Sequence, residues 1–165
     1  MIITGKAVKV GDHVNTDVIL PGKYLVFIEP EELAKHALEG LGPHFPEKAK
    51  SGVVLVAGKN FGCGSSREQA PIALKHANVK CIVADSFARI FYRNAINIGL
   101  PVVECKQISN KVSEGDQLAV DLAEGVIKDL TQNQAWQVKP IPKFLLEILT
   151  AGGLVEHLKK RIASK

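Results

Sequence analysis

A glycine-rich stretch with two hydroxyls and one cation is the part of this sequence best suited to chemistry. It reads Gly58-Lys-Asn-Phe-Gly-Cys-Gly-Ser-Ser-Arg-Glu-Gln69 and lies between an apolar run, Val53 to Ala57, and a segment that predicts a helix, Ala70 to Ala77. Glycines such as Gly64 let a backbone turn sharply and approach a ligand closely. A helix N-terminus attracts anions through its free N–H groups and its dipole. The stretch therefore predicts a binding site for a phosphate or a carboxylate.

Ser65, Ser66 and Arg67 decide what that site could do. Arginine can grip a carboxylate through two parallel hydrogen bonds, and a hydroxyl beside such a clamp suggests chemistry on a small acid. Helix capping is the simpler alternative, because Ser65 with Glu68 fits the S-x-x-E capping box. Ser66 with Gln69 fits the related S-x-x-Q pattern. One helix has a single N-cap position, so one hydroxyl is left for another role.

A second polar cluster, Asp12-His-Val-Asn-Thr-Asp17, follows the first predicted strand. Residues of these types commonly close turns with their own backbone. Asp17 is therefore either a turn residue or an acceptor that orients a catalytic hydroxyl, and the sequence leaves both roles open.

An excursion over residues 22–50 separates the first two predicted strands, and long connections of this kind often carry function. Its apolar start consists of Tyr24, Leu25, Val26 and Phe27. These side chains either join the core or line a pocket.

The elements around these motifs predict one α/β domain that spans all 165 residues. Strands are expected at 2–10, 53–57, 81–84 and 100–104, and helices at 30–38, 70–77 and 86–98, with Ser86 as the N-cap of the last. A hairpin at 117–121 and 126–130, a strand at 135–138 and helices at 143–150 and 154–163 complete the chain. The strand–helix alternation predicts a parallel core with right-handed crossovers.

Composition narrows the class of partner. Apolar residues make up 46% and charged residues 23%, as in ordinary globular proteins. The net charge of +4 comes from scattered lysines and arginines, and aromatics are only 5%, so we expect no nucleic-acid partner. The sequence contains no apolar run of membrane-spanning length and no signal-peptide pattern. We therefore expect a cytoplasmic chain without a membrane partner.

Three cysteines, Cys63, Cys81 and Cys105, are too widely spaced for a zinc or iron–sulfur motif. An odd number in a reducing compartment also argues against a disulfide framework. We expect no metal on this chain, and buried hydrophobic roles for Cys81 and Cys105. Cys63, within the glycine-rich stretch, is either a steric fit or a nucleophile.

Two alternatives from other functional classes compete with acid chemistry. Gly62-x-Gly64 after a strand, with Asp85 at the end of the next strand, resembles a dinucleotide-binding fingerprint. Arg67 stands where that fingerprint needs its third glycine. A protein that only senses or carries a carboxylate is the other alternative, but it needs no spare hydroxyl beside the arginine.

Three motifs together resemble one family. They are Gly62-Cys-Gly-Ser-Ser-Arg-Glu68, the Asp12–Asp17 cluster with Pro21 and Tyr24, and Phe87-Ala-Arg-Ile-Phe-Tyr-Arg-Asn94 continuing through Asn97-Ile-Gly-Leu-Pro101. They resemble the small subunits of 3-isopropylmalate dehydratase, which are the swivel domain of the aconitase superfamily made as a separate chain. The resemblance covers nearly the whole sequence and outweighs capping as the only role of the serines.

The resemblance implies a swivelling three-layer β/β/α domain and a large-subunit partner whose own cysteines bind a [4Fe–4S] cluster, with no cofactor on this chain. The reaction would interconvert 2-isopropylmalate and 3-isopropylmalate, small dicarboxylic hydroxyacids, through isopropylmaleate in leucine biosynthesis. Ser65 would act as the base and Asp17 would support the serine network. Substrate would be bound by Gly64, Ser66 and Arg67.

Substrate choice would depend on Tyr24, Leu25, Val26 and Phe27. Homoaconitases, which act on tricarboxylates, resemble this stretch but carry an arginine where Val26 stands here. An apolar residue at that position suits an isopropyl group, whose burial is worth about 1.5–3 kcal/mol. It also leaves a third carboxylate without a partner. Isopropylmalate is therefore favoured, with homoaconitase, citraconate hydratase and dimethylmalate dehydratase activities as alternatives.

Overall fold

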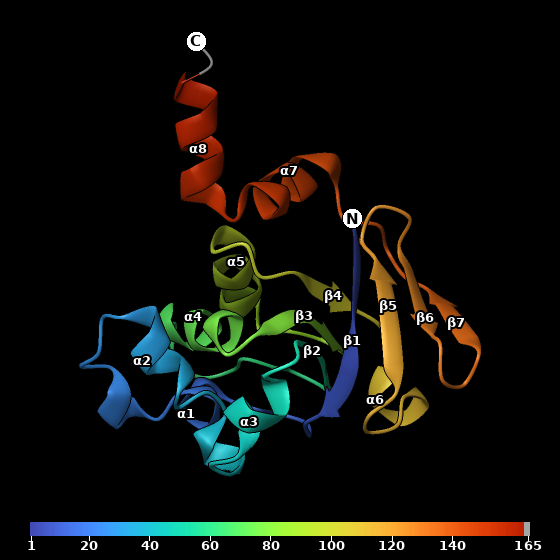
Figure 1. The fold of residues 1–165 in the computed structure, drawn as a ribbon, viewed down its shortest axis with the longest axis horizontal. Helices are drawn as coiled ribbons and strands as arrows, with labels where there is room; N and C mark the ends of the chain where they lie inside the picture. Colours follow the sequence, from blue (N-terminus) through green and yellow to red (C-terminus); the bar gives the residue numbers. More distant parts are fainter. Residues whose placement is uncertain (164–165) are drawn as a thin grey trace.

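Seven strands form one mixed sheet in the computed structural model, which describes residues 1–163 (Figure 1). Ser164 and Lys165, the end of the predicted domain, lie outside the described residues. The strands are β1 (Ile2–Lys9), β2 (Val53–Ala57), β3 (Val79–Ala84), β4 (Val102–Glu104), β5 (Gln117–Asp121), β6 (Val126–Asp129) and β7 (Gln134–Gln137). Their order is β4-β3-β2-β1-β5-β6-β7. Strands β1 to β4 are parallel and β5 to β7 antiparallel. The predicted α/β class with a partly parallel sheet is confirmed.

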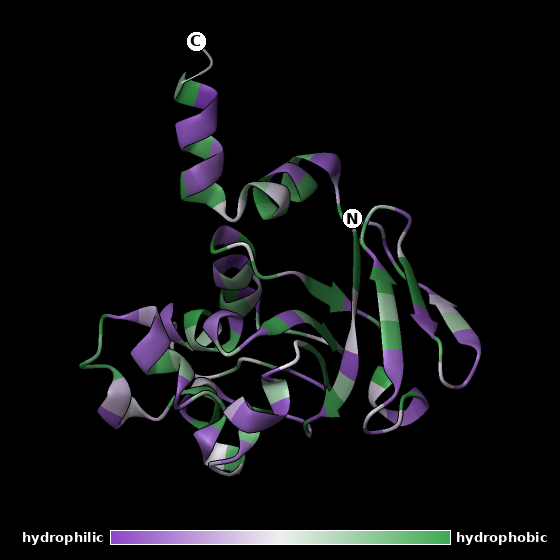
Figure 2. Ribbon diagram, in the orientation of Figure 1, coloured by the Kyte–Doolittle hydropathy of each residue, from purple (hydrophilic) through white to green (hydrophobic). Residues whose placement is uncertain are grey.

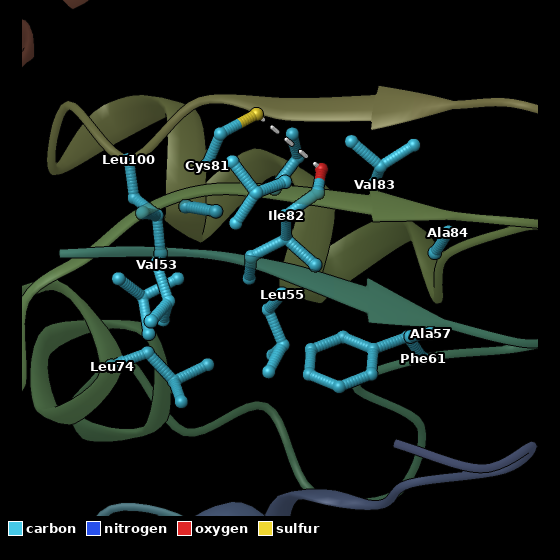
Figure 3. Packing of buried hydrophobic residues seen from close by; sticks show 14 of the residues in the cluster. Val53, Leu55, Ala57, Phe61, Leu74, Cys81, Ile82, Val83, Ala84 and Leu100 are labelled. Atoms are coloured by element: carbon cyan, nitrogen blue, oxygen red, sulfur yellow. Dashed lines mark hydrogen bonds between the residues drawn. The ribbon is translucent and has the colours of Figure 1, made fainter. Parts of the chain in front are cut away.

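The parallel half holds the core. Every residue of β2 is buried, as expected for a strand covered on both faces. Leu55 of β2, Ile82 of β3 and Leu74 of the helix that connects these two strands pack together, with Phe61 beside them (Figure 3). Figure 2 shows β2 and most of β3 in the colours of hydrophobic residues. The glycine-rich stretch that follows β2 therefore begins at a fully buried strand.

The helices are α1 (Thr16–Ile19), α2 (Pro30–Ala34), α3 (Phe45–Ala49), α4 (Gln69–His76), α5 (Arg89–Asn97), α6 (Ile108–Lys111), α7 (Lys143–Ala151) and α8 (Leu154–Ala163), with 3₁₀ turns η1 (Gly22–Tyr24) and η2 (Glu39–Leu41). Helices α4 and α5 connect β2 to β3 and β3 to β4, as the crossover pattern predicts. Helix α8 extends away from the rest of the domain (Figure 1). The short helices α1, α3 and α6 were not predicted, because four or five residues give too little periodicity to recognise.

Two predicted helix boundaries were wrong. Helix α2 ends at Ala34 rather than Leu38, because Leu38 adopts a left-handed conformation (φ 54°) and enters the core. Ser86 does not cap α5, which begins at Arg89. Residues 87 and 88 pair with the Phe61 segment instead, and the Ser86 hydroxyl accepts a hydrogen bond from the Asn60 N–H at 2.9 Å.

Candidate functional site

The glycine-rich turn is held by main-chain hydrogen bonds to the polar cluster before α1. The Gly62 N–H donates to the Val14 carbonyl at 2.8 Å, and the Thr16 N–H donates to the Cys63 carbonyl at 2.9 Å. Gly62 has a φ of +78°, and a Cβ there would lie 2.2 Å from Cγ of Phe91. Only glycine fits so close to α5 in that conformation. Two motifs far apart in sequence are thus joined into one unit.

A second set of bonds fixes the other side of the turn. The Phe61 N–H donates to the Ser86 carbonyl at 3.0 Å, and the Ala88 N–H donates to the Phe61 carbonyl at 2.9 Å. The Phe61 ring also packs edge-on against Phe87 and Phe91. The motif that begins at Phe87 therefore has a structural role, because it packs against the turn and bonds to it.

Ser65 and Ser66 do not cap α4, so the capping interpretation was wrong. The N-cap position belongs to Glu68, and no side chain caps the helix. Both serines are exposed, and within residues 1–163 neither hydroxyl has a hydrogen-bond partner. The preceding residue, Gly64, is also exposed and has a φ of +96°. Two hydroxyls are therefore presented to solvent from the turn just before α4.

Arg67 forms an ion pair with Asp17, its guanidinium donating to the carboxylate. It also approaches the Leu20 carbonyl at 3.4 Å. The arginine side chain is 20% exposed and that of Asp17 64%. Asn15 caps α1 by accepting from the Val18 N–H at 2.9 Å, which sets the position of Asp17. The structure thus places Asp17 against the guanidinium rather than against a serine hydroxyl.

The aromatic start of the 22–50 excursion is held by side chains. The Tyr24 ring stacks on His36 with centroids 3.5 Å apart, and its hydroxyl donates to Glu39 at 2.5 Å. His36 in turn contacts the other Glu39 oxygen at 2.7 Å. The hydrogen bonds from Tyr24 and then from His36 lower the pKa of the Glu39 carboxyl. The i, i+3 spacing of His36 and Glu39 could have indicated this pair from the sequence.

The four residues 24–27 divide between the core and solvent. Tyr24 and Leu25 pack against the core, whereas Phe27 is exposed and Val26 is 78% exposed. Ile28, which the sequence argument did not single out, is also exposed. Tyr24 to Phe27 line neither of two grooves found among residues 1–163. Val26, Phe27 and Ile28 instead form an exposed apolar surface at the end of this segment.

A large groove lies elsewhere on the domain. It has a volume of about 780 Å³ and runs between α5, β4 and residues 139–145. None of the predicted site residues lines it. The serines and Arg67 therefore occupy an open surface of the isolated chain, so any enclosed reaction chamber needs a second wall.

The described residues do not form a metal site. Within residues 1–163, no group of three or more His, Cys, Asp or Glu side chains is placed to hold a metal ion. Cys81 and Cys105 are buried, and complete burial raises the pKa of the Cys81 thiol to about 12. Cys63 is half-buried, with its thiol 3.7 Å from the His13 carbonyl. These residues do not fit an iron–sulfur cluster.

Asp85, the acid of the dinucleotide alternative, is already engaged. Its carboxylate accepts from the Ser109 N–H at 3.4 Å and from the Ser109 hydroxyl at 3.3 Å. It therefore holds the start of α6, and nothing in its contacts favours a ribose partner.

Known proteins resemble this chain over nearly its full length. The model for the aconitase C-terminal domain matches residues 42–108. A 3-isopropylmalate dehydratase small subunit from Pyrobaculum calidifontis is 57% identical, over 98% of this chain and 99% of its own. An isopropylmalate/citramalate isomerase small subunit from Methanocaldococcus jannaschii is 56% identical, over 98% and 96%.

A solved structure agrees with these sequences. The crystal structure of a 3-isopropylmalate dehydratase from Methanocaldococcus jannaschii superimposes with a TM-score of 0.92 at 48% identity, covering 99% of this chain and 96% of that one. The resemblance indicated by the three motifs is confirmed. Across residues 1–163, no helix is long and apolar enough to cross a membrane.

Proposed function

This chain belongs to the family of 3-isopropylmalate dehydratase small subunits, and we propose from that premise that it forms half of an isopropylmalate isomerase. The complete enzyme would interconvert 2-isopropylmalate and 3-isopropylmalate by dehydration and rehydration in leucine biosynthesis. One observation carries the proposal. Two exposed hydroxyls without partners among residues 1–163, Ser65 and Ser66, stand beside Arg67 on a turn held by main-chain bonds.

Ser65 is the proposed base. Its oxygen would remove the proton from the carbon next to a substrate carboxylate. During rehydration the Ser65 hydroxyl, after exchange with solvent, would supply a proton to the substrate. A serine hydroxyl is a weak base at neutral pH and must be activated. The start of α4 and the neighbouring guanidinium of Arg67 supply positive potential for the alkoxide. Exposure of Ser65 means that water must be excluded by a second protein before this potential becomes effective.

Arg67 is the proposed carboxylate-binding residue. Its planar guanidinium has five N–H donors, so the bond to Asp17 leaves donors for a substrate carboxylate. Asp17 fixes the direction of the guanidinium and limits its motion. Ser66 and the Gly64 backbone belong to the same turn and would complete the contacts to substrate.

The large subunit is the proposed source of the second wall and of the [4Fe–4S] cluster. The relatives are named small subunits, and the described residues of this chain do not fit a cluster. Iron in that subunit would assist departure of the substrate hydroxyl. This chain would contribute the base that removes the proton, the arginine that binds the substrate carboxylate and the side chains that contact the isopropyl group.

Val26 and Phe27 are proposed to contact the isopropyl group. Both are exposed apolar residues, and Val26 is free of packing constraints because 78% of its surface is accessible. Citramalate, which bears a smaller apolar group, is a second candidate substrate because one relative is named for both acids. A competition assay with isopropylmalate, citramalate and homocitrate ranks these possibilities.

Reconstitution tests the proposal. The chain is prepared alone and together with the large subunit under anaerobic conditions, and isomerisation is followed in both preparations. We expect no turnover by the chain alone and turnover by the pair. Activity of the isolated chain, or a stable complex that turns over no hydroxyacid of this class, would overturn it.

A further inference from the structure

A buried hydroxyl lies directly beneath the serine turn. Thr16 is only 2% exposed, and among the described residues its Oγ1 has no hydrogen-bond partner. The Thr16 N–H holds the Cys63 carbonyl, so the side chain is fixed below the turn. A Cβ placed on Gly64 would lie 3.2 Å from Thr16 Oγ1. The hydroxyl therefore faces Gly64, the residue that precedes Ser65.

A buried hydroxyl without a hydrogen-bond partner lowers the stability of the fold, so its presence calls for a functional explanation. Nearly all buried polar groups in folded proteins are hydrogen-bonded, and an unpaired one destabilises the native state. Valine has almost the same shape as threonine and would fill this position without the penalty. A donor without an acceptor, placed against the backbone of a proposed alkoxide, suggests that the acceptor is the alkoxide.

The other donors near Ser65 are partly committed. The guanidinium of Arg67 is paired with Asp17, and it is also the proposed partner of the substrate carboxylate. Anions in water-excluded sites depend on preorganised donors, each of which can be worth a factor of a hundred or more in rate. A hydroxyl that needs no charge compensation suits this role.

We propose that Thr16 is a positioning residue for Ser65. In the assembled enzyme, its hydroxyl donates a hydrogen bond to the Ser65 oxygen, which holds that oxygen toward the substrate and favours its ionised form. Thr16 keeps its own proton throughout, and the proton taken from the substrate resides on Ser65. This inference rests on the proposed function, in which Ser65 is the base.

Thr16→Val and Thr16→Ser test the inference in the complex with the large subunit. For Thr16→Val we expect a melting temperature of the free chain equal to or above that of the wild type. We expect kcat to fall roughly a hundredfold. The acidic limb of the pH–rate profile should move to higher pH, because losing a donor raises the pKa of Ser65. Thr16→Ser should restore most of the rate and the profile.

The controls separate the possible failures. Thr150→Val, at an exposed threonine of α7, should change neither rate nor profile. A Thr16→Val complex with unchanged kcat and profile overturns the inference. A lowered melting temperature with a lost rate that serine does not restore also overturns it, because the role is then structural. Ser65→Ala is measured in parallel, and full turnover by that variant would overturn the proposed function itself.

Discussion

The serine turn and the aromatic segment are held in the domain by different means. Main-chain hydrogen bonds fix residues 61–63, immediately before the serines, from two sides, to Val14 and Thr16 and to Ser86 and Ala88. Residues 24–28 are held by the Tyr24 side chain, which stacks on His36 and donates to Glu39, while Val26 and Ile28 are exposed. The proposed chemistry thus follows a segment held by main-chain bonds, whereas the proposed substrate choice depends on exposed side chains such as Val26 that can change at little cost to the fold.

Ser65→Ala should produce the largest effect and separates chemistry from stability. Loss of a general base typically costs 10²–10⁴ in rate, so we expect turnover of the reconstituted enzyme to fall about a thousandfold. Stability should change by less than about 0.5 kcal/mol, because the side chain is exposed and unbonded. Ser51→Ala, at another exposed serine, is the matched control for kcat and melting temperature.

Gly62→Ala should destabilise the segment that precedes the serines. The new Cβ would meet the Phe91 side chain at 2.2 Å, in a backbone conformation with φ +78°. Strain and overpacking together should cost about 3 kcal/mol of unfolding free energy, measured by denaturant titration. Gly11→Ala is the control, since a Cβ there meets no atom within 4 Å. Equal stability of the two variants would show that the turn is not rigidly held.

Arg67→Lys keeps the charge but removes the planar fork. We expect KM for the hydroxyacid to rise roughly ten- to a hundredfold with a smaller change in kcat, because a bidentate contact becomes a single one. Asp17→Asn provides the comparison, since it leaves the guanidinium but removes its ionic partner. An unchanged KM in Arg67→Lys would argue against carboxylate binding at this residue.

Val26→Arg should change selectivity without changing stability. The new guanidinium can meet a third carboxylate, so we expect the ratio of homocitrate to isopropylmalate turnover to rise about tenfold, equivalent to about 1.4 kcal/mol. The melting temperature should stay the same, because Val26 is 78% exposed. Ile28→Arg, two residues away and also exposed, tests whether position or charge alone matters. Unchanged relative rates would remove Val26 from the specificity determinants.

Acid should loosen the aromatic segment, because it protonates Glu39. The pKa of Glu39 is lowered from its ordinary value of 4.5, first by the hydrogen bond from Tyr24 and then by that from His36. A lowered carboxyl pKa stabilises the fold above the ordinary value, and this contribution disappears as the pH falls through the folded-state pKa. Ring NMR signals of Tyr24 should therefore change below about pH 4.5.

Tyr24→Phe and Tyr92→Phe sharpen that titration. Removing the Tyr24 hydroxyl should move the Glu39 transition upward toward its ordinary pKa, whereas Tyr92→Phe, at the only other tyrosine in the sequence, should not. A Glu39 transition that stays in place in Tyr24→Phe would mean that the tyrosine bond does not hold the segment.

The sequence was informative where patterns are long or glycine-dependent. The strand Val53–Ala57 and the hairpin after Gln117 appear almost as predicted, because apolar runs and turn residues mark them clearly. Three motifs also identified the family. The predicted cap at Ser86 failed because a tertiary pairing with Phe61 keeps the preceding residues extended.

The site itself was only partly predictable. Sequence spacing gave the serines and Arg67 but could not show that Asp17 would meet the guanidinium, since the contact spans fifty residues. The hydroxyl of Thr16 carries no sequence signal, because its meaning depends on burial and on the missing partner. Likewise, the exposure of Val26 follows from tertiary packing rather than from residue type.

Proton exchange with solvent tests most directly whether Ser65 is the base. The wild-type and Ser65→Ala complexes with the large subunit are incubated with 3-isopropylmalate in D₂O, and deuterium on the substrate carbons is measured by NMR. We predict that the wild type incorporates deuterium and that the variant binds the substrate but incorporates none above background. Incorporation by the Ser65→Ala complex at the wild-type rate would contradict the account.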